Sequence, residues 1–126
     1  MKEFKIFVNN KTGELARVTE ALATQAVNIR AISSEGGSPK AFLRIVTGDV
    51  ATTEKALKNA GLAFELSEII DLELMDRPGE LAKIARRLAR QGVNVESIYI
   101  LGSKNGKTHI ALTVSDLAKA KAAIGG

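Results

Sequence analysis

Two short turns in this sequence combine a glycine with side chains that can hydrogen-bond a charged ligand. The first is Asn10-Lys11-Thr12-Gly13, and the second is Asp76-Arg77-Pro78-Gly79. In each, the glycine separates an apolar stretch with strand character from an amphipathic stretch with helical spacing. The first N–H groups of a helix lack intrahelical partners and carry the positive end of the helix dipole. A turn of this kind can therefore receive a carboxylate.

The residue three places before each glycine adds a second polar group. Asp76 can accept hydrogen bonds from an ammonium group, and Asn10 can both donate and accept. A carboxylate receptor beside an ammonium receptor is what a free α-amino acid requires. The same residues also have a structural explanation, because glycine allows a tight turn, proline suits a first helical turn, and Asp or Asn often caps a helix. Spacing alone leaves both explanations open.

The two turns belong to an internal duplication. Residues 13–33 align with residues 79–99 at an offset of 66 (79 − 13), and ten of the 21 positions are identical. Beyond the next loop the offset becomes 67, because the second loop has one extra residue. Self-similarity of this length predicts two copies of one structural unit. We place them at residues 1–67 and 68–126.

Each copy has the same predicted order of elements. An apolar strand leads into the glycine turn, and an amphipathic helix, two strands and a second helix follow. The first helix of the second copy has an apolar stripe at Leu81, Ile84, Ala85, Leu88 and Ala89. The other predicted segments are the strands Phe4–Val8, Phe42–Thr47, Ala63–Leu66, Ile69–Leu74 and Thr108–Val114, the helices Val50–Ala60 and Asp116–Ile124, and strands beginning at Val27 and Val93.

The order βαββαβ followed by βαββα predicts an α+β fold of two ferredoxin-like units in tandem. Each unit is expected to be an antiparallel sheet with its helices on one face. The second unit has no counterpart of the strand at Ala63–Leu66. Its sheet is therefore expected to have an exposed edge. We expect another segment, from this chain or from a second copy, to cover that edge.

The composition excludes several classes of site. The chain has no cysteine and a single histidine, His109, which excludes disulfides, thiolate ligands and a metal site built from several histidines. No nucleophile–base pair, acid–base carboxylate pair or cofactor loop is evident, so we expect no enzymatic activity, no cofactor and no metal. We recognise no leader segment and no apolar run of membrane length. The expectation is a cytoplasmic protein with no membrane partner.

The net charge of +4 raises the question of nucleic-acid binding. The densest basic group lies on one predicted helix, at Lys83, Arg86, Arg87 and Arg90, and its spacing is that of a solvated face. RNA recognition motifs share the βαββαβ order but stack bases on aromatic side chains of their strands. The strands KAFLRIVT and GKTHIALTV contain one aromatic residue, Phe42, so we expect no nucleic-acid partner. A metal chaperone of this topology would need paired cysteines.

The stretch DRPGELAKIARRLARQGVNVESI, residues 76–98, carries a family resemblance. A strand that leads into D-R-P-G-E-L-A, an amphipathic helix and then G-V-N-V resembles the ACT domain, a small regulatory module with the βαββαβ fold. The earlier copy differs because Asn-Lys-Thr-Gly replaces Asp-Arg-Pro-Gly. The resemblance covers essentially the whole chain as two tandem ACT domains. It implies a non-catalytic sensor that binds a free amino acid at the interface between ACT units.

The resemblance also implies which residues bind the ligand, namely the glycine turn and the segment after the helix. Asn28 and Asn94 have the alternative explanation that their side chains bond to local backbone. Some ACT domains place a histidine two residues before the Asn or Asp of the turn, where this chain has Val8 and Leu74, and this departure leaves the ligand open. The implied ligand-binding residues are Asn10, Thr12, Gly13, Glu14, Leu15, Asn28 and Ile29 in the first copy and Asp76, Pro78, Gly79, Glu80, Leu81, Asn94 and Val95 in the second.

Most ACT domains are attached to an enzyme or a transcription regulator, whereas this chain resembles the stand-alone tandem proteins. A regulated protein would then be a separate chain, and we expect the ACT protein itself to be a homodimer. The apolar residues Leu15, Ile29, Leu81 and Val95 favour an aliphatic ligand. The alternative is a regulatory subunit or interaction module of a separate amino-acid biosynthetic enzyme, similar to the small subunit of acetolactate synthase.

Overall fold

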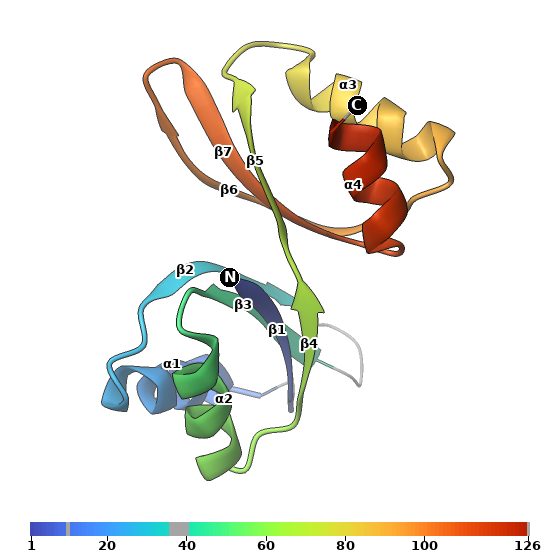
Figure 1. Ribbon diagram of the computed structural model, residues 1–126. Helices are drawn as coiled ribbons and strands as arrows, with labels where there is room; N and C mark the ends of the chain where they lie inside the picture. The colour runs from blue at the N-terminus through green and yellow to red at the C-terminus, as the bar shows by residue number, and fades with distance from the viewer. Residues whose placement is uncertain (10, 36–40, 126) are drawn as a thin grey trace. The chain divides into compact units, whose positions relative to one another are not determined.

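The computed structural model describes residues 1–9, 11–35 and 41–125. The chain divides into two compact units, Met1–Ser67 and Glu68–Gly126, which we call unit 1 and unit 2. Their elements follow the order βαββαβ and βαββα (Figure 1). The α+β fold of two tandem ferredoxin-like units, predicted from the repeat, is confirmed.

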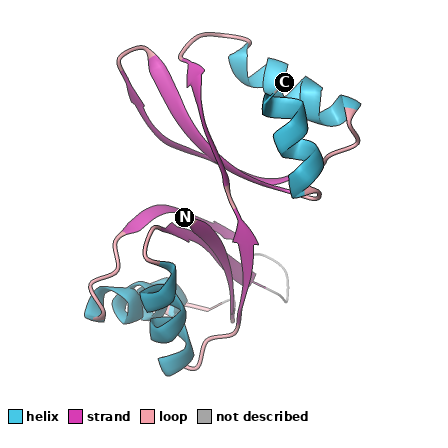
Figure 2. Ribbon diagram, in the orientation of Figure 1, coloured by secondary structure: helices cyan, strands magenta, loops and turns pink. Residues whose placement is uncertain are grey.

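Unit 1 is a four-stranded sheet with two helices on one face (Figure 2). The strand order is β2-β3-β1-β4, and β3 pairs antiparallel with both β1 and β2. The elements are β1 (Lys2–Val8), α1 (Glu14–Thr24), β2 (Ile29–Glu35), β3 (Ala41–Thr47), α2 (Val50–Asn59) and β4 (Phe64–Glu68).

Alternating residues of the central strands form the core of unit 1. Phe4 of β1 pairs with Ile45 of β3, and both are fully buried. Because side chains in a strand alternate between the two faces, every second residue meets the helices. The helices contribute Val18 and Leu22 of α1 and Leu57 of α2 to the same cluster. Buried residues at every second position of the strands and four positions apart in α1 therefore form one core.

Unit 2 has a three-stranded sheet in the order β5-β7-β6. Central β7 pairs antiparallel with both neighbours, so β5 and β6 are the edges of this sheet in the described part of the chain. No helix of the described residues is long and apolar enough to cross a bilayer. The elements are β5 (Ile70–Met75), α3 (Glu80–Arg90), β6 (Val95–Lys104), β7 (Lys107–Val114) and α4 (Leu117–Gly125).

The apolar stripe predicted on α3 is narrower in the structure. Ile84 and Leu88 are buried, whereas Leu81 is 45% exposed and both predicted alanines are exposed. Ala85 and Ala89 lie one residue, about 100°, further round the helix than the two buried residues. The helix therefore contacts its sheet along one line of side chains, and the prediction was wrong at the margin of the stripe.

Candidate functional site at the glycine turns

Gly79 adopts a backbone conformation that other residues avoid. It is the N-cap of α3, with φ 88° and ψ −11°, in the left-handed region. Gly13 has the equivalent conformation at the start of α1, with φ 93° and ψ −8°. A Cβ added at either glycine would find no atom within 4 Å beyond its chain neighbours. The backbone therefore requires glycine here, and the space above each turn is open.

Each helix begins without a side-chain cap. At α3 the first hydrogen bond of the helical ladder runs from the Lys83 N–H to the Gly79 carbonyl, at 3.1 Å. At α1 the equivalent bond runs from the Arg17 N–H to the Gly13 carbonyl, at 2.9 Å. At α3 the Glu80 N–H also donates to the Arg77 carbonyl, at 3.4 Å. The other N–H groups ahead of these ladder bonds have no helical partner and point toward the turn. Both turns therefore present backbone donors at the positive end of a helix dipole.

Pro78 and Asp76 lie outside helix α3. The expectation that Pro78 occupies the first helical turn was wrong, because the left-handed Gly79 is the N-cap and the helix starts one residue later, at Glu80. The alternative that Asp76 caps the helix was also wrong, since α3 has no side-chain cap bond. The Asp76 N–H instead donates to the Gly106 carbonyl at 2.9 Å, which ties the turn to the β6–β7 hairpin.

The carboxylate of Asp76 has no partner among the described residues. It is exposed, and neither a hydrogen bond nor an ion pair joins it to this part of the chain. Its counterpart by the repeat, Asn10, lies outside the described residues. The turn of unit 2 therefore offers an acceptor for a ligand's ammonium group beside the donors at the start of α3.

Basic side chains neutralise the glutamate that follows each glycine. The Glu80 Oε1 atom accepts from Arg77 Nε at 2.7 Å and from Lys83 Nζ at 3.2 Å. The hydrogen bond from Arg77, and then that from Lys83, hold the pKa of Glu80 below its usual value. In unit 1 the Glu14 carboxylate pairs with Arg17 at 3.0 Å, and Lys11 lies 3.9 Å away. The glutamates therefore do not repel an anion, because two cations accompany each of them.

Sequence reasoning did not assign a role to these basic residues. Their spacing from the glutamate contained the signal, because Arg77 and Lys83 each lie three residues from Glu80.

In unit 1, Thr12 is exposed, and a hollow of about 160 Å³ adjoins the turn. Asn9, Lys11 and Glu14 line this hollow together with residues of β2 and β3.

The asparagines after the helices leave their side chains unbonded in the described residues. Asn28 and Asn94 are both exposed, and Ile29 and Val95, which follow them, are partly buried. The backbone of Asn94 is fixed by Ser115, whose hydroxyl accepts from the Asn94 N–H at 2.9 Å and whose N–H donates to the Asn94 carbonyl at 2.9 Å. The alternative that the asparagine side chains bond to local backbone was therefore wrong.

No single unit brings a glycine turn and a helix-exit asparagine together. In each unit the two lie at opposite ends of a helix of 11 residues. At 1.5 Å per residue this separation is about 16 Å, which exceeds the length of most amino acids. One unit alone therefore supplies half of the predicted contacts to any one ligand.

The family described as the ACT domain pair matches residues 1–124. The chain belongs to this family. Among solved structures, this ACT domain pair is similar to protein BT0572 from Bacteroides thetaiotaomicron, with 28% identity, a TM-score of 0.87 and coverage of 98% of this chain and 85% of that one. No curated protein sequence matches it.

The ACT domain pair also shares its fold with a regulatory protein. The regulatory subunit of aspartate kinase from Thermus thermophilus, in its ligand-free form, has 18% identity and a TM-score of 0.71, with coverage of 98% of this chain and 87% of that one. The resemblance to tandem ACT domains inferred from the sequence is confirmed. ACT domains are regulatory modules, so membership of the family supports a regulatory, ligand-binding role.

Proposed function

We propose that this ACT domain pair is a non-catalytic sensor that binds a free amino acid between ACT units. The turn of unit 2 carries the proposal, because an exposed and unpaired carboxylate at Asp76 adjoins an uncapped helix start at Gly79. The uncapped N–H groups of α3 receive the ligand carboxylate, and Asp76 receives its ammonium group. No other group of the ligand needs to be charged.

A second ACT unit completes this proposed site. Because one unit holds its turn and its asparagine about 16 Å apart, the turn of one unit and the asparagine of another enclose the ligand. We propose that a homodimer supplies the units. The proposed ligand-binding residues are the fourteen implied by the resemblance: Asn10, Thr12, Gly13, Glu14, Leu15, Asn28 and Ile29, and Asp76, Pro78, Gly79, Glu80, Leu81, Asn94 and Val95.

Apolar residues beside the turns favour an aliphatic amino acid. Leu15 is 53% exposed and Leu81 is 45% exposed, at equivalent positions in the first turns of α1 and α3. Ile29 and Val95 are partly buried at the start of β2 and β6. Burial of a branched aliphatic side chain against such residues is favourable, at about 25 cal/mol per Å² of apolar area. We therefore propose a branched-chain amino acid as the ligand.

Thermal-shift screening of the full chain against the twenty amino acids, followed by calorimetry, tests the proposal. A ligand that binds only the folded state stabilises it by about 2.7 kcal/mol at a hundredfold excess over its Kd. We expect Asp76→Asn to weaken binding about tenfold, because it removes one charge-assisted hydrogen bond. Glu20→Gln, which removes an exposed carboxylate of α1 away from the turn, is the matched control. Failure of every amino acid to raise the melting temperature would refute the sensor.

A second proposal is that the chain is a regulatory subunit of a separate amino-acid biosynthetic enzyme. The likeness of its fold to the regulatory subunit of aspartate kinase favours this role. Affinity purification of the tagged full chain from its native host is expected to retain such an enzyme. The enzyme's activity should then respond to the amino acid only when this chain is present. An enzyme that responds equally without the chain would count against the proposal.

A further inference from the structure

A hollow of about 440 Å³ lies at the hairpin end of the sheet in unit 2. Its lining comes from Glu73 of β5, residues 101–105 of β6 and the following turn, and Lys107 and His109 of β7. We propose that this hollow binds a small organic molecule that carries a compact dianion, either a phosphate group or a pair of carboxylates.

The hollow opens on the face of the sheet away from the helices. Leu72 and Leu74 of β5 pack against the core beneath α3 and α4. Glu73 lies between these two residues in the strand and is exposed, so its side chain projects from the opposite face. His109 is the cross-strand partner of Glu73 and shares that face. This site is therefore distinct from the glycine turn, which leads into α3.

The positive charge of the hollow is incompletely balanced within the described residues. Lys104 and Lys107 are direct cross-strand partners, an arrangement that destabilises a sheet when the two charges are alike. The Glu73 carboxylate lies 4.0 Å from the Lys107 ammonium. Among the described residues Lys104 has no ion pair. A bound anion would remove the repulsion between the two lysines.

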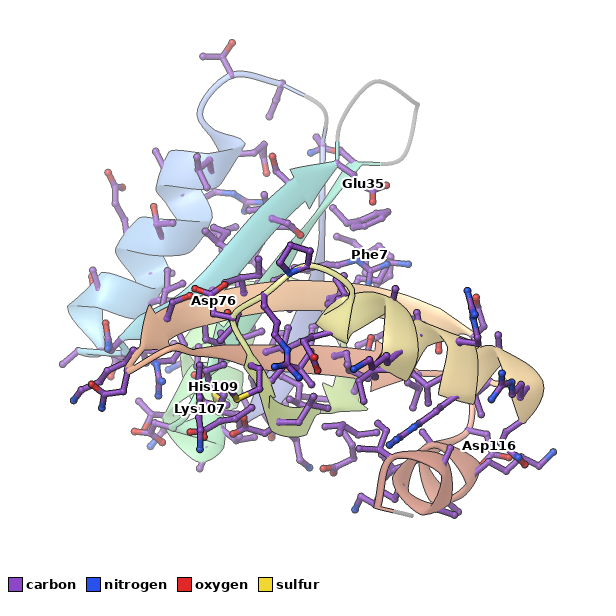
Figure 3. The ribbon with its side chains drawn as sticks, turned by 90° about the horizontal axis from the view of Figure 1, so that it is seen from above. Phe7, Glu35, Asp76, Lys107, His109 and Asp116 are labelled. Carbon is purple, nitrogen blue, oxygen red and sulfur yellow. The ribbon has the colours of Figure 1, made fainter. Side chains whose placement is uncertain are left out.

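His109 adds a further polar group to the same wall. Its Nε2 atom contacts the Oδ1 atom of Asp71, one strand away. Figure 3 shows His109 and Lys107 next to each other on β7. Because Asp71 is engaged by His109 and Glu73 by Lys107, the carboxylates are directed toward these partners. The ammonium groups of Lys104 and Lys107, which have three N–H groups each, and the side-chain amide of Asn105 remain as donors that a dianion can use.

Gly102 leaves space for a ligand in this wall. It is paired with His109, so a Cβ at this position would project on the same face of the sheet. Its φ lies outside the left-handed region, and an added Cβ would find no atom within 4 Å beyond its chain neighbours. Neither backbone conformation nor packing therefore requires glycine here. The register also shifts between Ile100 and Gly102, as in the β-bulges that often lie next to binding sites.

The size and the donors together define the ligand class. A volume of about 440 Å³ is within the range of small-molecule sites and exceeds what a single inorganic ion fills. Lys104 and Lys107 are cross-strand partners that both line the hollow, so two positive charges match two negative oxygens better than one. The ligand is therefore an organic phosphate or a dicarboxylate, with Lys104 and Lys107 at its dianionic group.

Amide NMR titration of the full chain tests this site with two probes, inorganic phosphate and succinate, at matched ionic strength. We expect saturable shifts at Glu73 and at residues 101–109 with at least one probe, and the stronger probe identifies the dianion. Lys104→Gln is expected to weaken binding about tenfold, because it removes one charge-assisted contact. Lys58→Gln, an exposed lysine of α2, is the control and should bind as the parent does.

Gly102→Val fills the hollow and should abolish binding while the melting temperature stays close to that of the parent. If Gly102→Val unfolds the chain, Lys104→Gln still tests the site. Lys104→Gln removes a positive charge next to Lys107, so the melting temperature of this variant should equal or exceed that of the parent. Amide shifts spread over exposed lysines of both units would overturn the proposal. Equal losses of affinity in Lys104→Gln and in the control Lys58→Gln would also overturn it. Amino-acid binding at the glycine turn should be unchanged in Lys104→Gln. The proposal for the hollow and the proposal for the glycine turn can therefore be refuted separately.

Discussion

At the level of single residues, the glycine turn combines a conformational requirement with an open space. Gly79 is left-handed with φ 88°, and no packed atom lies where its Cβ would be. A glycine that is required because a side chain would clash would show the reverse, an ordinary φ and a packed atom close to the position of its Cβ. The backbone conformation thus accounts for the residue type, and the empty space above it allows a ligand to approach the helix N–H groups.

We predict that Gly79→Ala lowers the free energy of unfolding by about 1 to 2 kcal/mol, because alanine disfavours the left-handed region. Urea denaturation of the full chain measures this change. Gly48→Ala is the control, since Gly48 has an ordinary φ and equally open surroundings, and its effect should stay within about 0.5 kcal/mol. Equal losses in the two variants would contradict the conformational argument. If Gly79→Ala lowers stability but leaves the amino-acid affinity unchanged, Gly79 has a structural role only.

At the level of elements, a buried pair of threonines joins β3 to α2 in unit 1. The Thr47 and Thr53 hydroxyls lie 2.8 Å apart, and the Thr53 hydroxyl donates to the Asp49 carbonyl at 2.7 Å. Thr47 therefore donates to Thr53. In unit 2 the equivalent positions are Val114 and Ala120, so the second copy joins the same two elements by apolar contact.

This difference between the copies predicts that the two single threonine substitutions of a double-mutant cycle have unequal costs in stability. Thr53→Ala should cost about 1 to 3 kcal/mol beyond its lost packing, because it leaves the fully buried Thr47 hydroxyl without its partner. Thr47→Val should cost less, since Thr53 keeps its bond to Asp49. The double variant, which recreates the pair of unit 2, should cost less than the sum of the single changes. Strict additivity in denaturation experiments would show that the two hydroxyls are not coupled.

The sequence predicted the order and type of these elements because each has a local signal. The alternation in β1 and the repeat around Gly13 and Gly79 are examples, since both depend on neighbouring residues. The exposure of Ala85 in α3 could not be predicted. The orientation of a helix about its own axis depends on the sheet against which it packs. The bond between Asp76 and Gly106 joins residues 30 positions apart (106 − 76), and no local pattern encodes it.

At the level of the whole molecule, the two sheets differ at one edge. In unit 1 the strand β1 lies between β3 and β4, and the Phe7 N–H donates outward to the Ala63 carbonyl at 3.0 Å. By the repeat, the counterpart of Phe7 is Glu73 in β5, an edge strand in the described part of unit 2. The Glu73 N–H is therefore directed away from β7, toward the position that β4 occupies in unit 1. An edge of this kind favours pairing with another strand.

We predict that a strand of a second copy covers this edge and that the chain is a dimer in solution. Light scattering after gel filtration gives the oligomeric state, and hydrogen exchange at the Glu73 amide reports on the edge itself. That amide should exchange slowly in the dimer and faster on dilution, because pairing provides its acceptor. The Ala111 amide of the central strand β7 is the control and should not respond to dilution. A strict monomer with rapid exchange at Glu73 would show that the edge is bare. Slow exchange in a monomer would instead mean that this chain covers its own edge, and the second ACT unit of the proposed amino-acid site would then come from within the chain.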